Sequence, residues 1–543
     1  MSTQAAPDRT LFDDADELEL RVPTSCRRSG RCRECIVEVA AGAEFLACRT
    51  EPELFLRDPY RLACQAAVVD PHARIDFSIL RRRLRILVPD VDDEPEPADA
   101  VVRIIDGNVY HREQLVEPLR GGIYGVAVDL GTTTIVAELV DLAAGRTVAV
   151  GALENPQRFG GSDIMNRISY DGSDGTGQLR RAARRALNRK LDELYATSGI
   201  DRREVYEAVV VGNSTMRDLF FGLDVSPIGE RPYKSLTEHE LHSGTRETTS
   251  LKAHAYELAF RSHPHASIWG APLIASHVGA DMAADLVALG VDDETDETVM
   301  IVDIGTNTEV ALAVPGRLAV ASCPAGPAFE GGLVEYGMQG VDGAIESIRR
   351  ENDGSFTCRT IGGMQPQGIC GSGLIDLLAE LRRSELMTPL GVFADGASLL
   401  TVDEEAGITF SRADGSALAQ AKAANTAGQW IVMRHLGIDP ADVERLYLVG
   451  GFANYVDVEN AIDIGFLPPV PPERVVKVGN ASVRGARRLL LSETARMWLE
   501  ALVLRIQHIE LETTPDFFDI FVEGCQFKPM PDQLRSADGQ VVL

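Results

Sequence analysis

The sequence predicts a multidomain protein in which a small cysteine-rich N-terminal domain precedes a duplicated, two-lobed α/β region. Two observations carry this prediction. The pattern Asp-x-Gly-Thr follows an apolar run twice, at Asp129 and again at Asp303. Of the nine cysteines in the chain, five are gathered between Cys26 and Cys64. With 543 residues, the chain is long enough to form several domains, each with its own hydrophobic core.

The N-terminal cysteines are spaced like the ligands of a metal centre. Cys26, Cys32 and Cys35 form a C-x5-C-x2-C loop ahead of a short apolar strand, and plant-type [2Fe–2S] centres use a similar loop with a distant fourth cysteine. Cys64 lies at the more suitable distance for this fourth ligand, and Cys48 is the alternative. Two other interpretations are a structural zinc site, which usually has paired cysteine knuckles, and cysteines without metal. We expect an iron–sulfur cluster.

Between this region and the first Asp-x-Gly-Thr pattern the composition changes. Residues 91–100, VDDEPEPADA, are acidic, contain proline and have little to bury, which is typical of an extended linker. Residues 101–119 are expected to add a strand and a short helix. This stretch is too short for a separate domain of ordinary size.

The first Asp-x-Gly-Thr pattern predicts a β-hairpin that approaches a ligand. In YGVAVDLGTTT an apolar run leads to Asp129 and a tight turn, and a second apolar-alternating run follows. Gly131 lets the backbone come close to a ligand, while Thr132 and Thr133 offer hydroxyl and amide donors. Asp129 is placed where a carboxylate could hold hydrated Mg²⁺, which prefers one or two carboxylates together with phosphate oxygens and water.

The same features recur in VMIVDIGTNTEVA, where Asp303, Gly305, Thr306 and Asn307 take the matching positions. A single Asp-Gly turn says little, because such turns occur in many hairpins. Two copies, each behind an apolar run, indicate a duplicated fold that closes on a nucleotide. The alternative is a set of unrelated turns.

Two further glycine-rich segments fit the same ligand. Gly450 and Gly451 follow the strand LYLV and would let the chain pass under an adenosine. Gly371 and Ser372 begin an amphipathic helix, and helix N-termini bind phosphate readily. No G-x-x-x-x-G-K-[ST] pattern is present, so the chain is not a P-loop protein.

The overall composition limits the classes of binding partner that we expect. Hydrophobic residues make up 45% of the chain and charged residues 25%, as in ordinary globular proteins. A formal net charge of −28 argues against nucleic acid, because phosphate binding needs clustered lysine and arginine. No apolar run has the length of a membrane span, and the acidic N-terminus lacks the basic and apolar parts of a signal peptide. We therefore expect a cytoplasmic protein without membrane partners.

These motifs together resemble the reductive activators of corrinoid proteins, in which a [2Fe–2S] ferredoxin-like domain is joined to an ATPase domain. The stretches that carry the resemblance span nearly the whole chain: CRRSGRCREC, RLACQ, YGVAVDLGTTT, VVVGNSTM, VDIGTNTE, CPAGPAFEG, GICGSGLID, LVGGFANY and VGNASVRGA. The resemblance implies a ferredoxin-like α+β (β-grasp) domain at residues 1–80. A linker with a short remnant of a middle segment would follow at 81–120. Residues 121–543 would form a duplicated RNase H-like α/β ATPase of the acetate and sugar kinase, chaperone and actin (ASKHA) type.

By the same resemblance, the activity is the ATP-dependent reduction of a corrinoid protein from Co(II) to Co(I), with the electron delivered by the [2Fe–2S] cluster. ATP and Mg²⁺ would lie between the lobes, with Asp129 and Asp303 as the catalytic carboxylates. The expected partners are a corrinoid protein of a methyltransferase system, an external low-potential electron donor and, in a homodimer, a second copy of the chain.

Other functional classes share some of these features. A ferredoxin-like electron carrier could use the lobes only to sense ATP without hydrolysing it. An activator of radical dehydratases also pairs this ATPase fold with iron–sulfur, but places its cluster between subunits. A simple sugar or acetate kinase leaves the cysteine loop unexplained. The chain also departs from the family, since the stretches before Cys26 and between Leu80 and Gly121 are short for the opening β-hairpin and the middle domain.

Overall fold

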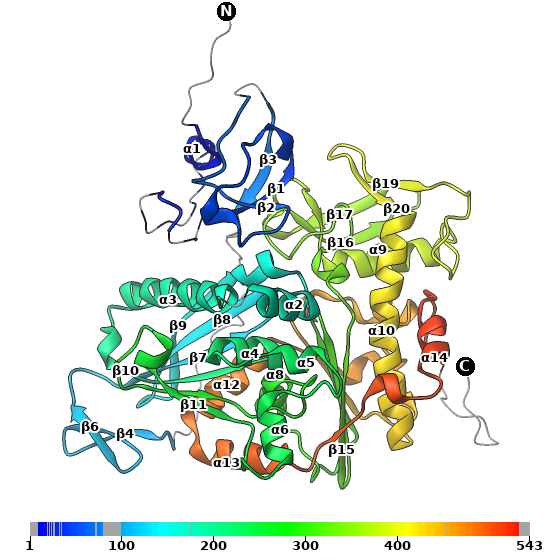
Figure 1. Cartoon of the computed structure of the whole chain (residues 1–543). Helices are drawn as coiled ribbons and strands as arrows, with labels where there is room; N and C mark the ends of the chain where they lie inside the picture. The colour runs from blue at the N-terminus through cyan, green and yellow to red at the C-terminus, as the bar shows by residue number, and fades with distance from the viewer. Residues whose placement is uncertain are drawn as a thin grey trace, which may run out of the picture.

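The computed structural model describes residues 9–531, apart from residues 19, 21, 23, 25, 27, 32, 34, 71–72, 80–98, 175 and 452. A small N-terminal domain lies above the first of two lobes, and each lobe contains a six-stranded sheet (Figure 1). None of the helices within the described ranges is long and apolar enough to cross a bilayer.

The N-terminal domain has an antiparallel sheet with the strand order β2-β1-β3. Its elements are α1 (Leu11–Glu17), β1 (Ile36–Ala41), η1 (Ala43–Phe45), η2 (Glu51–Glu53), β2 (Tyr60–Leu62) and β3 (Asp76–Ile79). The strand expected after the cysteine loop is therefore confirmed, and the stretch before that loop contains α1. A buried ion pair of 2.8 Å between Arg61 and Glu53 fixes β2 against η2.

Residues 102–118 form a three-stranded sheet of β4 (Val102–Ile105), β5 (Asn108–His111) and β6 (Gln114–Pro118). The expected strand is present, but two further strands take the place of the expected short helix, so that part of the expectation was wrong. Asp106 and Gly107 both have positive φ, 48° and 74°, which is the geometry of a two-residue hairpin turn. The acidic linker lies almost wholly outside the described residues.

The sheet of the first lobe has the order β11-β12-β10-β7-β8-β9. Its strands are β7 (Tyr124–Leu130), β8 (Thr134–Asp141), β9 (Arg146–Glu154), β10 (Val205–Gly212), β11 (Leu251–His254) and β12 (Ser267–Gly270). The helices of this part of the chain are α2 (Ile164–Asp174), α3 (Gln178–Ser198), α4 (Ser214–Phe221), α5 (Ser226–Gly229), α6 (Leu236–His242), α7 (Ala255–Leu258) and α8 (Ala280–Leu289), with η3 (Pro156–Gly160) and η4 (Arg202–Glu204).

The sheet of the second lobe has the order β22-β21-β13-β14-β15-β23. Its strands are β13 (Val299–Ile304), β14 (Thr308–Val314), β15 (Arg317–Cys323), β21 (Arg445–Val449), β22 (Val475–Gly479) and β23 (Gln507–His508). Smaller sheets contain β16 (Ala344–Arg350), β17 (Phe356–Thr360), β18 (Gly368–Ile369), β19 (Leu399–Asp403) and β20 (Ile408–Ser411). The helices are α9 (Gly371–Arg383), α10 (Arg412–Leu436), α11 (Val458–Asp463), α12 (Ala481–Leu491), α13 (Glu493–Leu502) and α14 (Phe517–Gly524), with η5 (Ala328–Glu330).

The two sheets repeat one topology, as the duplicated motif predicts. In the first, β7, β8 and β9 pair in antiparallel order, while β10 and then β12 add in parallel on the other side of β7. In the second, β13, β14 and β15 repeat the antiparallel part, and β21 and β22 the parallel part. The two Asp-x-Gly-Thr turns thus join corresponding pairs of strands, β7–β8 and β13–β14.

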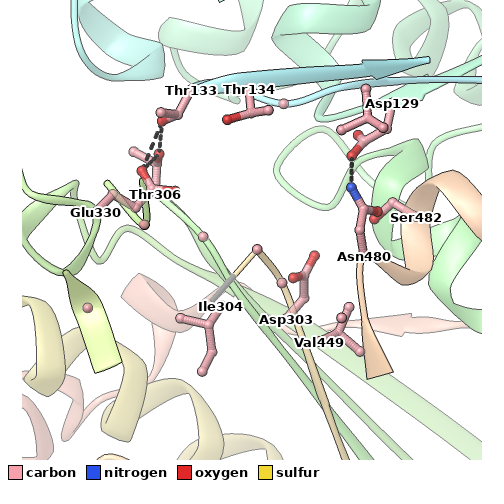
Figure 2. Close-up of a pocket in the computed structure, with 18 of the residues that line it drawn as sticks. Asp129, Thr133, Thr134, Asp303, Ile304, Thr306, Glu330, Val449, Asn480 and Ser482 are labelled. Carbon is pink, nitrogen blue, oxygen red and sulfur yellow. Dashed lines mark hydrogen bonds between the residues drawn. The ribbon is translucent and has the colours of Figure 1, made fainter. Parts of the chain in front are cut away.

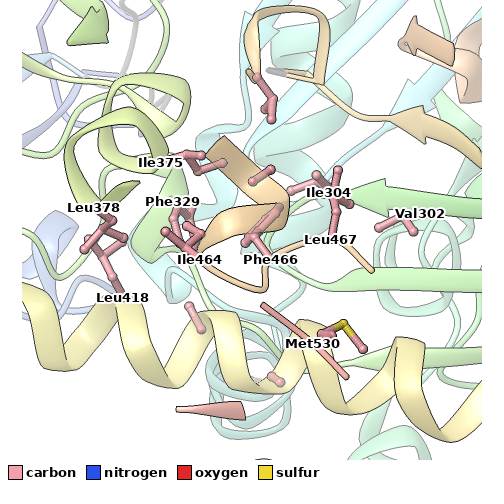
Figure 3. Packing of buried hydrophobic residues seen from close by; sticks show 14 of the residues in the cluster. Val302, Ile304, Phe329, Ile375, Leu378, Leu418, Ile464, Phe466, Leu467 and Met530 are labelled. Atoms are coloured by element: carbon pink, nitrogen blue, oxygen red, sulfur yellow. The ribbon is translucent and has the colours of Figure 1, made fainter. Parts of the chain in front are cut away.

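Two helices from distant parts of the chain lie between the sheets. Helices α8 and α12 pack together and contribute Ala283, Ala284, Leu489 and Leu490 to a core that includes Ala127 of β7. The last part of the chain therefore completes the first lobe. The outer face of the second sheet has its own core, in which Val302, Phe329 and Phe466 lie in one cluster with side chains of α9 and α10 (Figure 3).

Candidate functional site

A cleft lies between the lobes at the turns of the two central hairpins (Figure 2). Every residue that the sequence analysis assigned to the nucleotide lines this cleft: Asp129, Gly131, Thr132, Thr133, Asp303, Gly305, Thr306, Asn307, Gly371, Ser372, Gly450 and Gly451. Segments that are far apart in the sequence meet here because the corresponding turns of the two sheets face the same space.

A carboxylate joins the two threonine-containing turns across the cleft (Figure 2). The Thr133 hydroxyl donates to Glu330 Oε2 at 2.9 Å and lies 3.1 Å from the Thr306 hydroxyl, which also donates to Glu330. Burial raises the pKa of the Glu330 carboxyl. In this structure, hydroxyl donors suited to phosphate oxygens are therefore bonded to a carboxylate of the protein itself.

Two asparagines at helix starts orient the first turn, and the candidate residues did not include them. Asn480 caps α12 and donates from Nδ2 to Asp129 Oδ2 at 2.9 Å. Asn213 caps α4 and donates from Nδ2 to Thr132 Oγ1 at 3.0 Å. The local sequence indicates both residues, because each asparagine follows a glycine at the end of a strand and precedes a helix.

Three aspartates, Asp129, Asp281 and Asp303, line the same cleft. Loss of water raises the pKa of Asp129 and of Asp303 to about 7, and the charge of Asp281 adds to the shift of both. Loss of water also raises the pKa of Asp281 to about 6. Crowded carboxyl oxygens suit a hard divalent cation such as Mg²⁺. Within the described ranges no three His, Cys, Asp or Glu side chains are grouped so that they could hold one metal ion.

These carboxyl groups predict that stability depends on pH when no cation is bound. Their folded-state pKa lies above the unfolded value, so between about pH 4 and 7 the folded state binds more protons and its free energy of unfolding falls as pH rises. We expect the Tm of nucleotide-free protein in a chelator to fall from about pH 5 to 8. In calorimetry, the Tm of Asp303→Asn should depend less on pH than that of wild type. Asp293→Asn, which loses only a surface pair with Arg505, should show the same pH dependence of Tm as wild type. A Tm that rises over this range would contradict the prediction.

Backbone geometry explains why glycine occupies the end of β21. Gly450 has a φ of 114°, and a Cβ atom at this position would lie 2.2 Å from the carbonyl oxygen of Ile304. At α9, the Ser372 hydroxyl donates to the Glu346 carbonyl at 2.8 Å. Ser372 is thus fixed at the first turn of α9, beside the cleft.

The N-terminal domain brings two of the predicted metal ligands together. The Sγ atoms of Cys35 and Cys64 are 3.3 Å apart, and both residues are buried. The hydrogen bond from Cys35, followed by those from the Gln65 side chain and the Gly30 amide, lowers the pKa of Cys64 to about 6. Thiols near each other, with an amide directed at a sulfur, are the donor set that iron–sulfur clusters use. These residues therefore fit the cluster.

The other three cysteines of the N-terminal region differ in their surroundings. Cys26 is partly buried in the same loop, and Cys32 lies outside the described residues. Cys48, the alternative fourth ligand, is exposed. The loop conformation itself requires Gly30, which has a φ of 75° and would place a Cβ atom 2.9 Å from Pro52.

Family models match the chain in three consecutive segments. Residues 1–69 match a 2Fe-2S iron-sulfur cluster binding domain, residues 124–294 match the RACo middle region, and residues 297–536 match the C-terminal domain of RACo, the ASKHA domain. The border between the second and third segments falls between α8 and β13, where the chain passes from the first sheet to the second.

Relatives of known name resemble the chain over most of its length. The corrinoid activation enzyme RamQ of Eubacterium limosum is 29% identical over 572 residues, covering 92% of this chain and 93% of the relative. The [Co(II) methylated amine-specific corrinoid protein] reductase of Methanosarcina barkeri is 24% identical over 432 residues, covering 74% and 76%. The solved structure of a reductive activator for corrinoid, iron-sulfur protein covers 97% of both chains, with a TM-score of 0.69 and 25% identity. The chain therefore belongs to the family of reductive activators of corrinoid proteins, which join an iron–sulfur domain to an ASKHA domain.

Proposed function

We propose that this protein reduces the cobalt of a corrinoid protein from Co(II) to Co(I) in a reaction that ATP drives. The observation that carries the proposal is the presence, in one chain, of a close pair of thiols in the N-terminal domain and a two-lobed cleft. The cysteines Cys26, Cys32, Cys35 and Cys64 would hold a [2Fe–2S] cluster, which supplies single electrons at low potential. The domain bounds of 1–80, 81–120 and 121–543 stay a prediction.

The energetics explain why an electron carrier alone is insufficient. Plant-type [2Fe–2S] centres have potentials of roughly −400 mV, and the Co(II)/Co(I) couple of a corrinoid lies lower. A deficit of 100 mV corresponds to about 2.3 kcal/mol per electron. A conformational change that binds the partner in a state favouring Co(I), and then releases it, can offset such a deficit if ATP drives the cycle.

The residues of the cleft have distinct roles in this proposal. The amides and hydroxyls of Gly131–Thr133 and Gly305–Asn307 bind the phosphates, and Gly450 and Gly451 make room for the adenosine. Asp129 and Asp303 hold Mg²⁺ through water, and Asp281 adds negative charge beside them. Gly371 and Ser372 present the N-terminus of α9 to an anion. A cytoplasmic location, where thiols stay reduced, suits the cysteine site.

One assay separates this function from that of an electron carrier that only senses nucleotide. The protein is mixed with a Co(II) corrinoid protein and a low-potential reductant, and Co(I) absorption and phosphate release are followed together. We expect Co(I) to accumulate only with hydrolysable ATP, with release of phosphate. Co(I) formation with a non-hydrolysable analogue, without phosphate release, would instead support the electron carrier.

A further inference from the structure

The N-terminal domain contacts the first lobe through three aromatic rings, which we call the aromatic contact. Phe55, two residues after η2, packs against Phe159 of η3 with 5.8 Å between centroids and an interplanar angle of 85°. Phe159 meets Tyr170 of α2 at 5.5 Å and 81°, and the Tyr170 hydroxyl donates to the Phe55 carbonyl. Phe159 and Tyr170 are each 3% exposed. The cores of the domain and of the first lobe are continuous here.

Polar contacts surround these rings on the side of the cysteine loop. The Arg33 guanidinium lies over the Phe55 ring, 4.6 Å from its centroid, and Arg33 is two residues from Cys35. Arg158 of η3 pairs with Glu38 of β1 at 2.9 Å. The position of the cysteine loop relative to the first lobe therefore depends on η3.

The other end of the same segment holds the first nucleotide turn. Asn155, which precedes η3, donates from its backbone N to the Thr133 carbonyl at 2.7 Å and from Nδ2 to the Gly131 carbonyl at 2.8 Å. Asn155 is 1% exposed and also caps η3. One short, buried segment thus connects the carbonyls on both sides of Thr132 with the aromatic contact.

We propose that Asn155 and Phe159 are positioning residues through which nucleotide binding at the first turn weakens the aromatic contact. This inference rests on the proposed function, because it requires that ATP binds the cleft. In the structure, the N-terminal domain is docked while Thr133 is bonded to Glu330 and Thr306. A terminal phosphate needs the same hydroxyl and repels the Glu330 carboxylate, so it favours a different position of the turn. Asn155 is bonded to that turn on both sides, and η3 moves with it. A ligand that binds the undocked arrangement increases its population.

The direction of the coupling gives a sharp test, because coupling between two sites is reciprocal. If docking of the N-terminal domain opposes nucleotide binding, a variant with a weakened aromatic contact must bind the nucleotide more tightly. We expect Phe159→Leu and Phe55→Leu each to bind a magnesium complex of a non-hydrolysable ATP analogue at least about fivefold more tightly than wild type, measured by calorimetry. The double variant should gain no more than either single variant, since the two rings form one contact.

A matched control tests whether any lost aromatic ring has this effect. Phe260 is also buried in the first lobe, where its ring lies 6.5 Å from that of Phe220, and Phe260→Leu should bind the analogue as wild type does. Hydrogen exchange at residues 51–62 provides a second readout, which should accelerate in wild type when the analogue binds. Unchanged or weaker binding by folded Phe159→Leu would overturn the proposal.

The same measurements distinguish a failure of the proposed function from a failure of the coupling. If wild type binds no analogue, the proposed function fails and this inference fails with it. If wild type binds the analogue but exchange at residues 51–62 stays constant, only the coupling through Asn155 and Phe159 is wrong.

Discussion

Replacing Asp303 with asparagine should lower ATP-dependent Co(I) formation at least about 100-fold, the loss typical when one preorganised electrostatic group is removed from an active site. Asparagine has the same shape, so the β13–β14 turn keeps its geometry while the cleft loses a negative charge that would hold Mg²⁺. Reduction of the cluster itself should be unaffected, because the cysteines belong to a separate domain. Co(I) formation, phosphate release and cluster reduction by dithionite are measured on the same preparation.

Asp293→Asn is the matched control, since it removes a carboxylate from the connection between α8 and β13 that pairs with Arg505 on the surface. It should retain the activity of wild type. Full reactivation by Asp303→Asn would exclude this carboxylate from the ATP-dependent step.

Replacing Cys64 with serine should abolish the iron–sulfur centre, whereas Cys48→Ser should retain it. Cys64 is buried, and its Sγ atom lies 3.3 Å from that of Cys35 and accepts a hydrogen bond from the Gly30 amide. Cys48, by contrast, is exposed. A hydroxyl cannot replace the thiolate ligand that such clusters require. Anaerobic preparations of both variants are compared by iron and sulfide content, visible absorption and electron spin resonance.

The outcome for Cys48→Ser identifies the fourth ligand directly. Loss of iron in Cys48→Ser, with iron retained in Cys64→Ser, would reverse our assignment. If wild type instead contains zinc in place of iron, the cysteines form a structural metal site and not an iron–sulfur cluster.

Much of the cleft could be predicted because its glycines and threonines lie in hairpin turns, and a turn places its residues by local geometry alone. Both strand pairs, β7–β8 and β13–β14, could therefore be placed from the alternation around Asp129 and Asp303. Repetition of the pattern then implied two related sheets with a ligand between them.

Asp281 and Glu330, which were not among the candidates, reach the cleft through tertiary packing. Asp281 lies near the start of α8, and nothing in its local sequence indicates that α8 packs between the two sheets. The local sequence around Glu330 does not reveal its contact with Thr133, because that contact depends on how the lobes close. By contrast, the turn at Asp106 and Gly107 was a missed local signal, since Asp-Gly is a strong hairpin pair.

The packing of α12 against β7 has a consequence for how this protein is made. Proteins of many domains generally fold from the N-terminus as synthesis proceeds. Here the first lobe lacks part of its interior until residues 481–502 have left the ribosome, because Leu489 and Leu490 fill it. Nascent chains must therefore hold an incomplete apolar surface through most of translation, and a fragment that stops at residue 294 would expose that surface permanently.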